Sequence, residues 1–116
     1  MVVWQDAMDL AEHCYRSTRS FPRNEMYGMT SQIRSASSSV SASTAEGNGR
    51  ESTGASIQFL RVSQGSLKEL ETHLLPARRV ELLDKVSADA LLARCEKTGK
   101  LPGALIRALQ AREART

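Results

Sequence analysis

Four side chains belong to the types that most often act as nucleophiles, general bases or zinc ligands: Cys14, Cys95, His13 and His73. Neither cysteine lies in a CxxC pair or in a spaced Cys/His cluster, so the spacing predicts neither a zinc site nor a disulfide framework. His13 and Cys14 are neighbours, and neighbours on a helix point to different faces, which is the wrong geometry for a Cys-His dyad. We therefore expect two buried, reduced thiols and no metal site.

The acidic residues give no catalytic pair either. Glu69 and Glu71 lie on different faces of a helix and cannot act together as acid and base. His73 follows Glu69 by four residues, which favours a surface helix pair over a general base. A triad or an HExxH motif would have to include one of the two histidines, and neither has a second partner at suitable spacing. The sequence predicts that the protein is not an enzyme, with no catalytic residues and no cofactor.

A glycine-rich segment, Gly47-Asn48-Gly49-Arg50, is followed by Gly54 and superficially resembles a phosphate-binding loop. The Lys-Ser/Thr pair of a P-loop is missing, however, and no strand pattern precedes the segment. A turn between two helices is the better interpretation, because glycine commonly ends a helix. Arg50 lies next to the start of the following helix and could still hold a phosphate there.

The composition is that of a small helical domain. At 116 residues the chain is long enough for one hydrophobic core, so we expect a single domain over residues 1–116. Apolar residues make up 41% and only five residues are aromatic, which leaves the core to aliphatic side chains and favours helices. No segment approaches the length of a membrane span and the N-terminus has no signal-peptide pattern, so we expect a cytoplasmic protein without membrane contact.

The charge is mildly basic. A formal charge of +3 and an isoelectric point near 9.2 are compatible with a polyanionic partner without requiring one. Twelve of the sixteen basic residues are arginines, the side chain best suited to bidentate phosphate contacts. From Glu51 onward eleven basic residues face eight acidic ones, so the excess lies in the second half of the chain.

Apolar periodicity predicts a first helix over residues 3–20, which Phe21-Pro22 ends because proline cannot donate the continuing hydrogen bond. The expected buried stripe consists of Trp4, Ala7, Met8, Ala11, Cys14 and Tyr15. A second helix is expected to begin near Asn24, a good N-cap residue. The serine-rich residues 35–45 could form a linker, but Ala36 and Val40 stay in helical phase and favour a continuing helix. Gly47-Asn48-Gly49 predicts its end.

The third predicted helix covers residues 52–83 and has the most regular apolar pattern. Pro76 lies inside it and predicts a kink or an end one residue earlier. Ser87 is the expected cap of the last helix, in which Gly99 and Pro102-Gly103 predict either one kinked helix or two short helices in line. Four amphipathic helices with short connections predict an all-α, up-and-down antiparallel four-helix bundle.

Several segments, in order and spacing, resemble one known family, the four-helix bundle proteins of ribosomal RNA intervening sequences. They are Val3-Trp4-Gln5, Ala7-Met8-Asp9-Leu10-Ala11, Phe21-Pro22, Glu25, Tyr27-Gly28-Met29-Thr30-Ser31-Gln32-Ile33-Arg34, Ala45-Glu46-Gly47, Gly49-Arg50, Phe59-Leu60, Gly65-Ser66-Leu67 and Glu69-Leu70-Glu71-Thr72. The resemblance implies a ring-like homopentamer without enzymatic activity. A related branch, the accessory proteins of diversity-generating retroelements, works with a reverse transcriptase and binds nucleic acid, so RNA or DNA and a reverse transcriptase are the partners that the resemblance implies.

Two functional hypotheses follow. In the first, the chain is a homo-oligomeric accessory protein that binds nucleic acid, and a ring of copies multiplies its modest charge. The alternative is a protein-interaction scaffold that self-assembles and does not bind nucleic acid. The candidate nucleic-acid contacts are Arg34, Arg50, Arg61, Arg78, Arg79 and Arg107.

Overall fold

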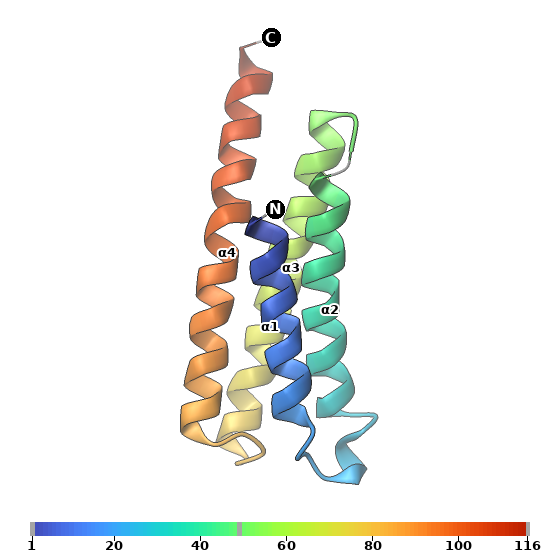
Figure 1. Ribbon diagram of the computed structural model, residues 1–116, viewed down its shortest axis with the longest axis vertical. Helices are drawn as coiled ribbons and strands as arrows, with labels where there is room; N and C mark the ends of the chain where they lie inside the picture. Colours follow the sequence, from blue (N-terminus) through green and yellow to red (C-terminus); the bar gives the residue numbers. More distant parts are fainter. Residues whose placement is uncertain (1, 49, 116) are drawn as a thin grey trace.

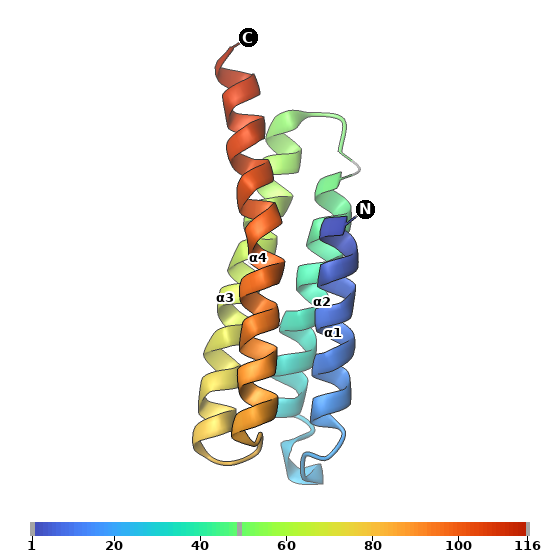
Figure 2. The same cartoon turned by 60° about the vertical axis from the view of Figure 1, so that its left-hand side comes forward.

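The computed structural model describes residues 2–48 and 50–115, which form four long helices and one short 3-10 turn. The elements are α1 (Val2–Thr18), η1 (Arg23–Glu25), α2 (Met29–Asn48), α3 (Thr53–Arg79) and α4 (Lys85–Ala114). Consecutive helices run in opposite directions and lie side by side in a molecule of 53 × 22 × 20 Å (Figure 1, Figure 2). The described residues contain no strand, and the predicted all-α, up-and-down four-helix bundle is confirmed.

All four helices contribute to one hydrophobic core. Its residues recur at three- and four-residue steps, so each helix turns one stripe inward. The fully buried members are mostly aliphatic, as the low aromatic content predicts, and the two cysteines are buried free thiols among them. Representative core residues are Leu10, Cys14, Ile33, Val40, Leu70, Leu74, Leu91 and Cys95.

The predicted stripe of α1 is only partly correct. Trp4, Met8 and Tyr15 are 38%, 43% and 41% exposed, whereas Leu10 and Cys14 are fully buried. The apolar face of α1 is wider than the surface that its neighbours cover, so the core takes one side of it. The three large side chains lie four and seven residues apart and form an exposed row, which we call the α1 apolar stripe.

The serine-rich segment, residues 35–45, is helical, as the helical phase of its apolar residues predicts. Its hydroxyl groups form hydrogen bonds to the neighbouring helix, which accounts for the many small polar residues. Thr44 and Ser63 are buried and their hydroxyl oxygens lie 2.9 Å apart, while those of Ser39 and Ser66 lie 2.7 Å apart. Thr44 also donates to the carbonyl of Val40 at 2.7 Å. These bonds satisfy polar groups between α2 and α3, and short side chains let the two helices approach closely.

Helix α2 begins at Met29, so the predicted start near Asn24 is wrong. Asn24 lies in η1, and no side-chain cap bond is recorded there. The carboxylate of Glu25 instead accepts the Met29 N–H at 3.2 Å. This carboxylate stabilises the helix start from four residues away, because the first N–H groups of a helix lack internal acceptors. The sequence predicts the end of α2 at Gly47-Asn48-Gly49. Gly47 and Asn48 are the last two residues of α2, and Gly49 lies outside the described residues.

Helix α3 continues past Pro76 to Arg79, so the predicted early end is wrong. Pro76 is exposed and lies in the last turn, so its missing donor removes one helical hydrogen bond, to the carbonyl four residues earlier, and the helix ends three residues later. The true end is set by Glu81, whose φ of 64° is left-handed. The N–H of Glu81 donates to Arg78 at 3.0 Å and that of Leu82 to Ala77 at 2.9 Å, the pattern of a Schellman motif.

Asp84, and not Ser87 as predicted, caps α4. The carboxylate of Asp84 accepts the Ser87 N–H at 2.7 Å and the Ser87 hydroxyl at 3.1 Å. The helix then runs unbroken to Ala114 through Pro102-Gly103, so neither predicted interruption divides it. Pro102 and Gly103 are buried against the neighbouring helices, and this packing offsets the weak helix preference of both residues.

The helices differ in length. Near the start of α1, the Thr98 hydroxyl donates to the Asp6 carbonyl at 3.5 Å and Lys97 lies 3.8 Å from the Asp6 carboxylate. Beyond this level α1 extends only to Val2, whereas α4 continues for sixteen residues to Ala114. One end of the bundle is therefore built from α2, α3 and α4 without α1, as Figures 1 and 2 show.

Candidate nucleic-acid interface

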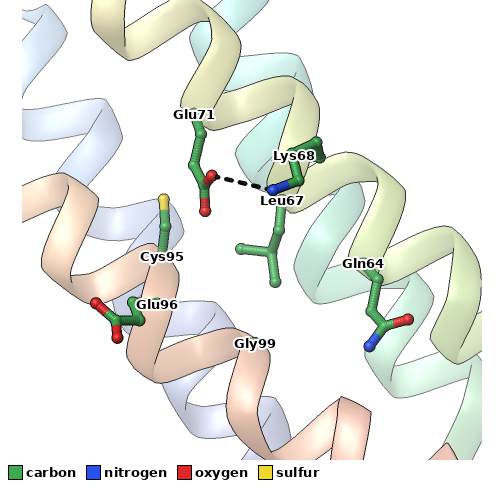
Figure 3. Close-up of a pocket in the computed structure, with 7 residues that line it drawn as sticks. All are labelled: Gln64, Leu67, Lys68, Glu71, Cys95, Glu96 and Gly99. Carbon is green, nitrogen blue, oxygen red and sulfur yellow. Dashed lines mark ion pairs between the residues drawn. The ribbon is translucent and has the colours of Figure 1, made fainter.

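A surface groove of about 410 Å³ runs between α3 and α4. Figure 3 shows its lining, which we call the α3–α4 groove: Gln64, Leu67, Lys68, Glu71, Cys95, Glu96 and Gly99. The α3 side chains share one helical face, because Gln64 lies three, four and seven residues before Leu67, Lys68 and Glu71. On α4, Gly99 likewise follows Glu96 by three residues and Cys95 by four. Two antiparallel rows of side chains therefore face each other across the groove.

Two glycines on α4 lie close to side chains of α3. A methyl group at Gly99 would lie 3.4 Å from Leu67 of α3. A methyl group at Gly103, one turn further, would lie 3.4 Å from Nε2 of Gln64 and 3.5 Å from Nη1 of Arg107. The guanidinium of Arg107 thus lies back over Gly103, beside the polar end of Gln64.

The lining of the α3–α4 groove carries two acidic side chains and one basic one, and basic residues lie beyond it along the same two helices. Glu71 and Glu96 line one half, where Lys68 lies 3.8 Å from Glu71 (Figure 3). Toward the end that lacks α1, Arg107 approaches Gln64, and Arg61 precedes Gln64 by one turn on the same face of α3. Lys100 precedes Arg107 by two turns on the same face of α4. We call Arg61, Lys100 and Arg107 the basic end of the groove.

Two of the other predicted contacts are engaged within the bundle. Arg34 on α2 donates through Nε to the Thr18 hydroxyl at 2.8 Å, and its guanidinium lies 4.9 Å from the centre of the Tyr15 ring. Arg50 forms an ion pair with Glu46, and its guanidinium lies 4.5 Å from the centre of the Phe59 ring. Both arginines therefore have structural partners that a nucleic acid would have to replace.

The remaining two predicted contacts lie at the far end of α3. Arg78 is 3.5 Å from Asp89, whereas Arg79 is exposed and has no carboxylate partner among the described residues. Seventeen residues of helix separate Arg61 from Arg78, which is about 25 Å along the axis. One chain therefore places Arg61 and Arg107 on facing helices near Gln64, but does not bring all six predicted arginines into one patch.

Nine of the sixteen basic side chains have no ion pair or side-chain hydrogen bond within the part of the chain that the structure describes. They are Arg19, Arg23, Arg61, Arg79, Arg94, Lys100, Arg107, Arg112 and Arg115. Sequence reasoning missed Lys100, Arg19 and Arg23 as candidate contacts. The seven-residue spacing from Lys100 to Arg107 was a readable signal, whereas Arg19 and Arg23 follow a helix and share no helical phase.

The two cysteines are buried, and His73 lies beside a carboxylate. Burial raises the pKa of Cys14 to about 12, and burial together with the nearby Cys14 and Glu71 raises the pKa of Cys95 to about 12. Both thiols therefore stay protonated and unreactive near neutral pH. Nε2 of His73 lies 3.6 Å from Glu69, which is the helix pair expected from their spacing.

The part of the chain that the structure describes has neither a cluster of metal ligands nor a helix that could cross a membrane. Residues 2–48 and 50–115 contain no group of three or more His, Cys, Asp or Glu side chains placed to hold a metal ion. None of the helices in these ranges is long and apolar enough to span a bilayer.

The helix order and the single shared core define the class: a small up-and-down four-helix bundle protein. Residues 1–104 match the family model of the 23S rRNA-intervening sequence protein, and the chain belongs to that family. No curated protein matches it significantly. A crystal structure of a protein of unknown function from the S23 ribosomal protein family of Bacteroides thetaiotaomicron superposes with a TM-score of 0.80. That match covers 90% of this chain and 97% of the other at 19% identity, and it supports the fold alone.

Proposed function

We propose that the protein is a non-enzymatic, self-assembling, cytoplasmic bundle that binds the phosphate backbone of RNA or DNA. The observation that carries the proposal is the basic end of the α3–α4 groove, where Arg61, Lys100 and Arg107 lack carboxylate partners among the described residues. Guanidinium and ammonium groups that are not neutralised internally can replace the counterions of a nucleic acid. The family's description, 23S rRNA-intervening sequence protein, is compatible with an RNA partner.

The α1 apolar stripe supports the self-assembly part of the proposal. Trp4, Met8 and Tyr15 are large and exposed, and their spacing places them on one side of α1. Exposed apolar rows of this kind usually mark a protein interface. If α1 packs against a second copy, the basic groove is repeated around the assembly and several weak phosphate contacts act together. The pentamer and the reverse-transcriptase partner, both implied by the family resemblance, remain predictions.

Binding is tested by fluorescence anisotropy with labelled single-stranded RNA and duplex DNA at increasing salt. The double variant Arg61→Gln/Arg107→Gln should weaken binding and reduce the salt slope by about 1 for each phosphate contact that it removes. The control, Arg16→Gln/Lys85→Gln, removes the same charge from side chains already paired with Glu12 and Asp89. Equal losses in the two double variants would contradict a role for the groove, and no binding at low salt would contradict the function.

Assembly is tested by light scattering of the same protein. The wild-type chain should have a mass of several copies, and Trp4→Gln/Met8→Gln should shift it toward the monomer, because the change removes apolar area from the α1 apolar stripe. The matched control is Val62→Gln, which changes an exposed apolar residue on α3. An assembled protein that ignores all nucleic acids would favour the alternative, a scaffold for protein interactions, and a monomeric wild type would contradict self-assembly.

A further inference from the structure

A second, smaller pocket of about 170 Å³ lies where α1 connects to α2, at the opposite end of the bundle from the basic end of the α3–α4 groove. Arginine side chains from three segments line it: Arg19 after α1, Arg23 in η1, and Arg34 on α2. Its volume corresponds to about six water molecules, which is enough for one tetrahedral oxyanion. We call it the α1–α2 pocket.

Two of the three arginines have no internal partner. Arg19 and Arg23 are exposed and form no ion pair or side-chain hydrogen bond within the described chain. Arg34 is half-buried and fixed, because Nε donates to Thr18 at 2.8 Å and a second nitrogen lies 3.4 Å from the Tyr15 carbonyl. The pocket therefore combines one positioned guanidinium with two that are available to close on a ligand.

Thr30, which also lines the pocket, has an unpaired hydroxyl. The residue is 8% exposed and its hydroxyl has no hydrogen-bond partner among the described residues, yet this oxygen is not one of the fully enclosed unsatisfied atoms. Hydroxyls of largely buried residues are normally bonded, so an unpaired one that reaches the pocket is available to donate to a ligand. This is independent of the arginine charges, because a hydroxyl attracts no counterion by itself.

The backbone at the same position adds donors. Thr30 and Ser31 are the second and third residues of α2, and neither N–H has an acceptor in the described structure, whereas Met29 N–H bonds to Glu25 and Gln32 N–H to Gly28. Free N–H groups at a helix start favour an anion. Among the described residues, Glu25 is the carboxylate bonded at this helix start, and the three arginines that line the pocket outnumber it.

We propose that the α1–α2 pocket binds one phosphate group, with the Thr30 hydroxyl and the first α2 N–H groups as donors and Arg19, Arg23 and Arg34 as counter-charges. The phosphate belongs either to a nucleic acid or to a free small anion, and both present the same oxygens. The first source would deepen the proposed function and rests on it, whereas the second stands without it.

The test is a titration of uniformly 15N-labelled protein with inorganic phosphate, followed by the amide signals of Thr30 and Ser31. Saturable shifts should occur, and Arg19→Gln/Arg23→Gln should weaken the phosphate affinity on the order of tenfold, since two charge-assisted contacts are lost. The control Arg112→Gln/Arg115→Gln removes the same charge from the end of α4 and should leave the affinity unchanged. Thr30→Val, which keeps the shape of the side chain, should weaken binding without altering the net charge.

The source of the phosphate is then resolved with one short oligonucleotide, with and without a 5′-phosphate. Shifts of the same two amides with either oligonucleotide assign the pocket to nucleic acid, and shifts with inorganic phosphate alone assign it to a free anion. No shift with any probe, or equal weakening in both arginine double variants, would overturn the site. Anisotropy binding that survives in a chain without these shifts would overturn the pocket while leaving the proposed function intact.

Discussion

The close approach of α2 and α3 predicts opposite effects for one substitution at two glycines. A methyl group at Gly47 would lie 3.3 Å from the Leu60 and Phe59 side chains and 3.3 Å from the backbone carbonyl oxygen of Ser56. A methyl group at Gly65, on the exposed side of α3, would have no neighbour within 4 Å. The two changes add the same group to a helix and differ only in what it meets.

The magnitudes follow from helix preference and packing. Replacing glycine by alanine within a helix stabilises it by about 1 kcal/mol, and Gly65→Ala should gain this amount in full. Gly47 lies next to the end of α2, where the gain is smaller, and inserting a methyl group into a packed interface costs about 1–3 kcal/mol. The Ser56 carbonyl cannot rotate away, so we expect Gly47→Ala to lower the free energy of unfolding by about 1 kcal/mol.

Urea unfolding followed by helical circular dichroism measures both effects. All chains should be compared at one protein concentration, because self-assembly would make the unfolding free energy depend on concentration. In thermal unfolding, Gly65→Ala should raise the midpoint by roughly 4 °C and Gly47→Ala should lower it by a similar amount. Equal stabilisation by both substitutions would refute the close contact between α2 and α3.

Three further results are expected. Hydrogen bonds from the Ser87 N–H and hydroxyl lower the pKa of Asp84 below 3.8, so Asp84→Ala should destabilise the bundle at pH 7. The stability difference from wild type should disappear as the pH falls below 3.8 and the carboxylate becomes protonated. Thermal unfolding of both proteins from pH 7 to pH 2 measures this difference. Because burial raises the pKa of Cys14 and Cys95 to about 12, Ellman's reagent should label neither thiol at pH 8 in the folded protein and both in urea. Glu81→Gly should raise the unfolding free energy by up to about 1 kcal/mol in urea titrations, since glycine accepts the left-handed conformation more readily, and a loss of stability would contradict that strain.

The bundle could be predicted from sequence because each helix carries an apolar period long enough to identify it. The serine-rich part of α2 was assigned correctly from Ala36 and Val40, whose phase outweighed the composition. Helix ends were less predictable, since Asn24 and Ser87 both have capping side chains but Glu25 and Asp84 make the bonds. Cap preference describes a residue type, whereas the chosen cap depends on how the preceding turn is folded.

The candidate interface was less predictable than the fold. Arg34 and Arg61 both lie within predicted amphipathic helices, and nothing in the sequence distinguishes their roles. In the structure, Arg34 donates to Thr18 on another helix, whereas Arg61 has no partner among the described residues. Contacts between helices decide which arginines remain available to bind a phosphate. Such contacts cannot be predicted from the spacing of residues along one helix. Similarly, the apolar period of α1 includes Trp4 and Leu10 alike, and only the arrangement of its neighbours decides that Leu10 is buried.

Because α1 is short, the two ends of the bundle should differ in how fast they open locally, as well as in structure. Where α1 supports α4, near Thr98, backbone amides should open to deuterium exchange only with global unfolding. Beyond that level the last turns of α4, up to Ala114, pack against fewer neighbours and should exchange through local fraying. Opening there would leave the core around Leu70 intact, so this end of the molecule can rearrange around a ligand without a cost to the rest of the fold.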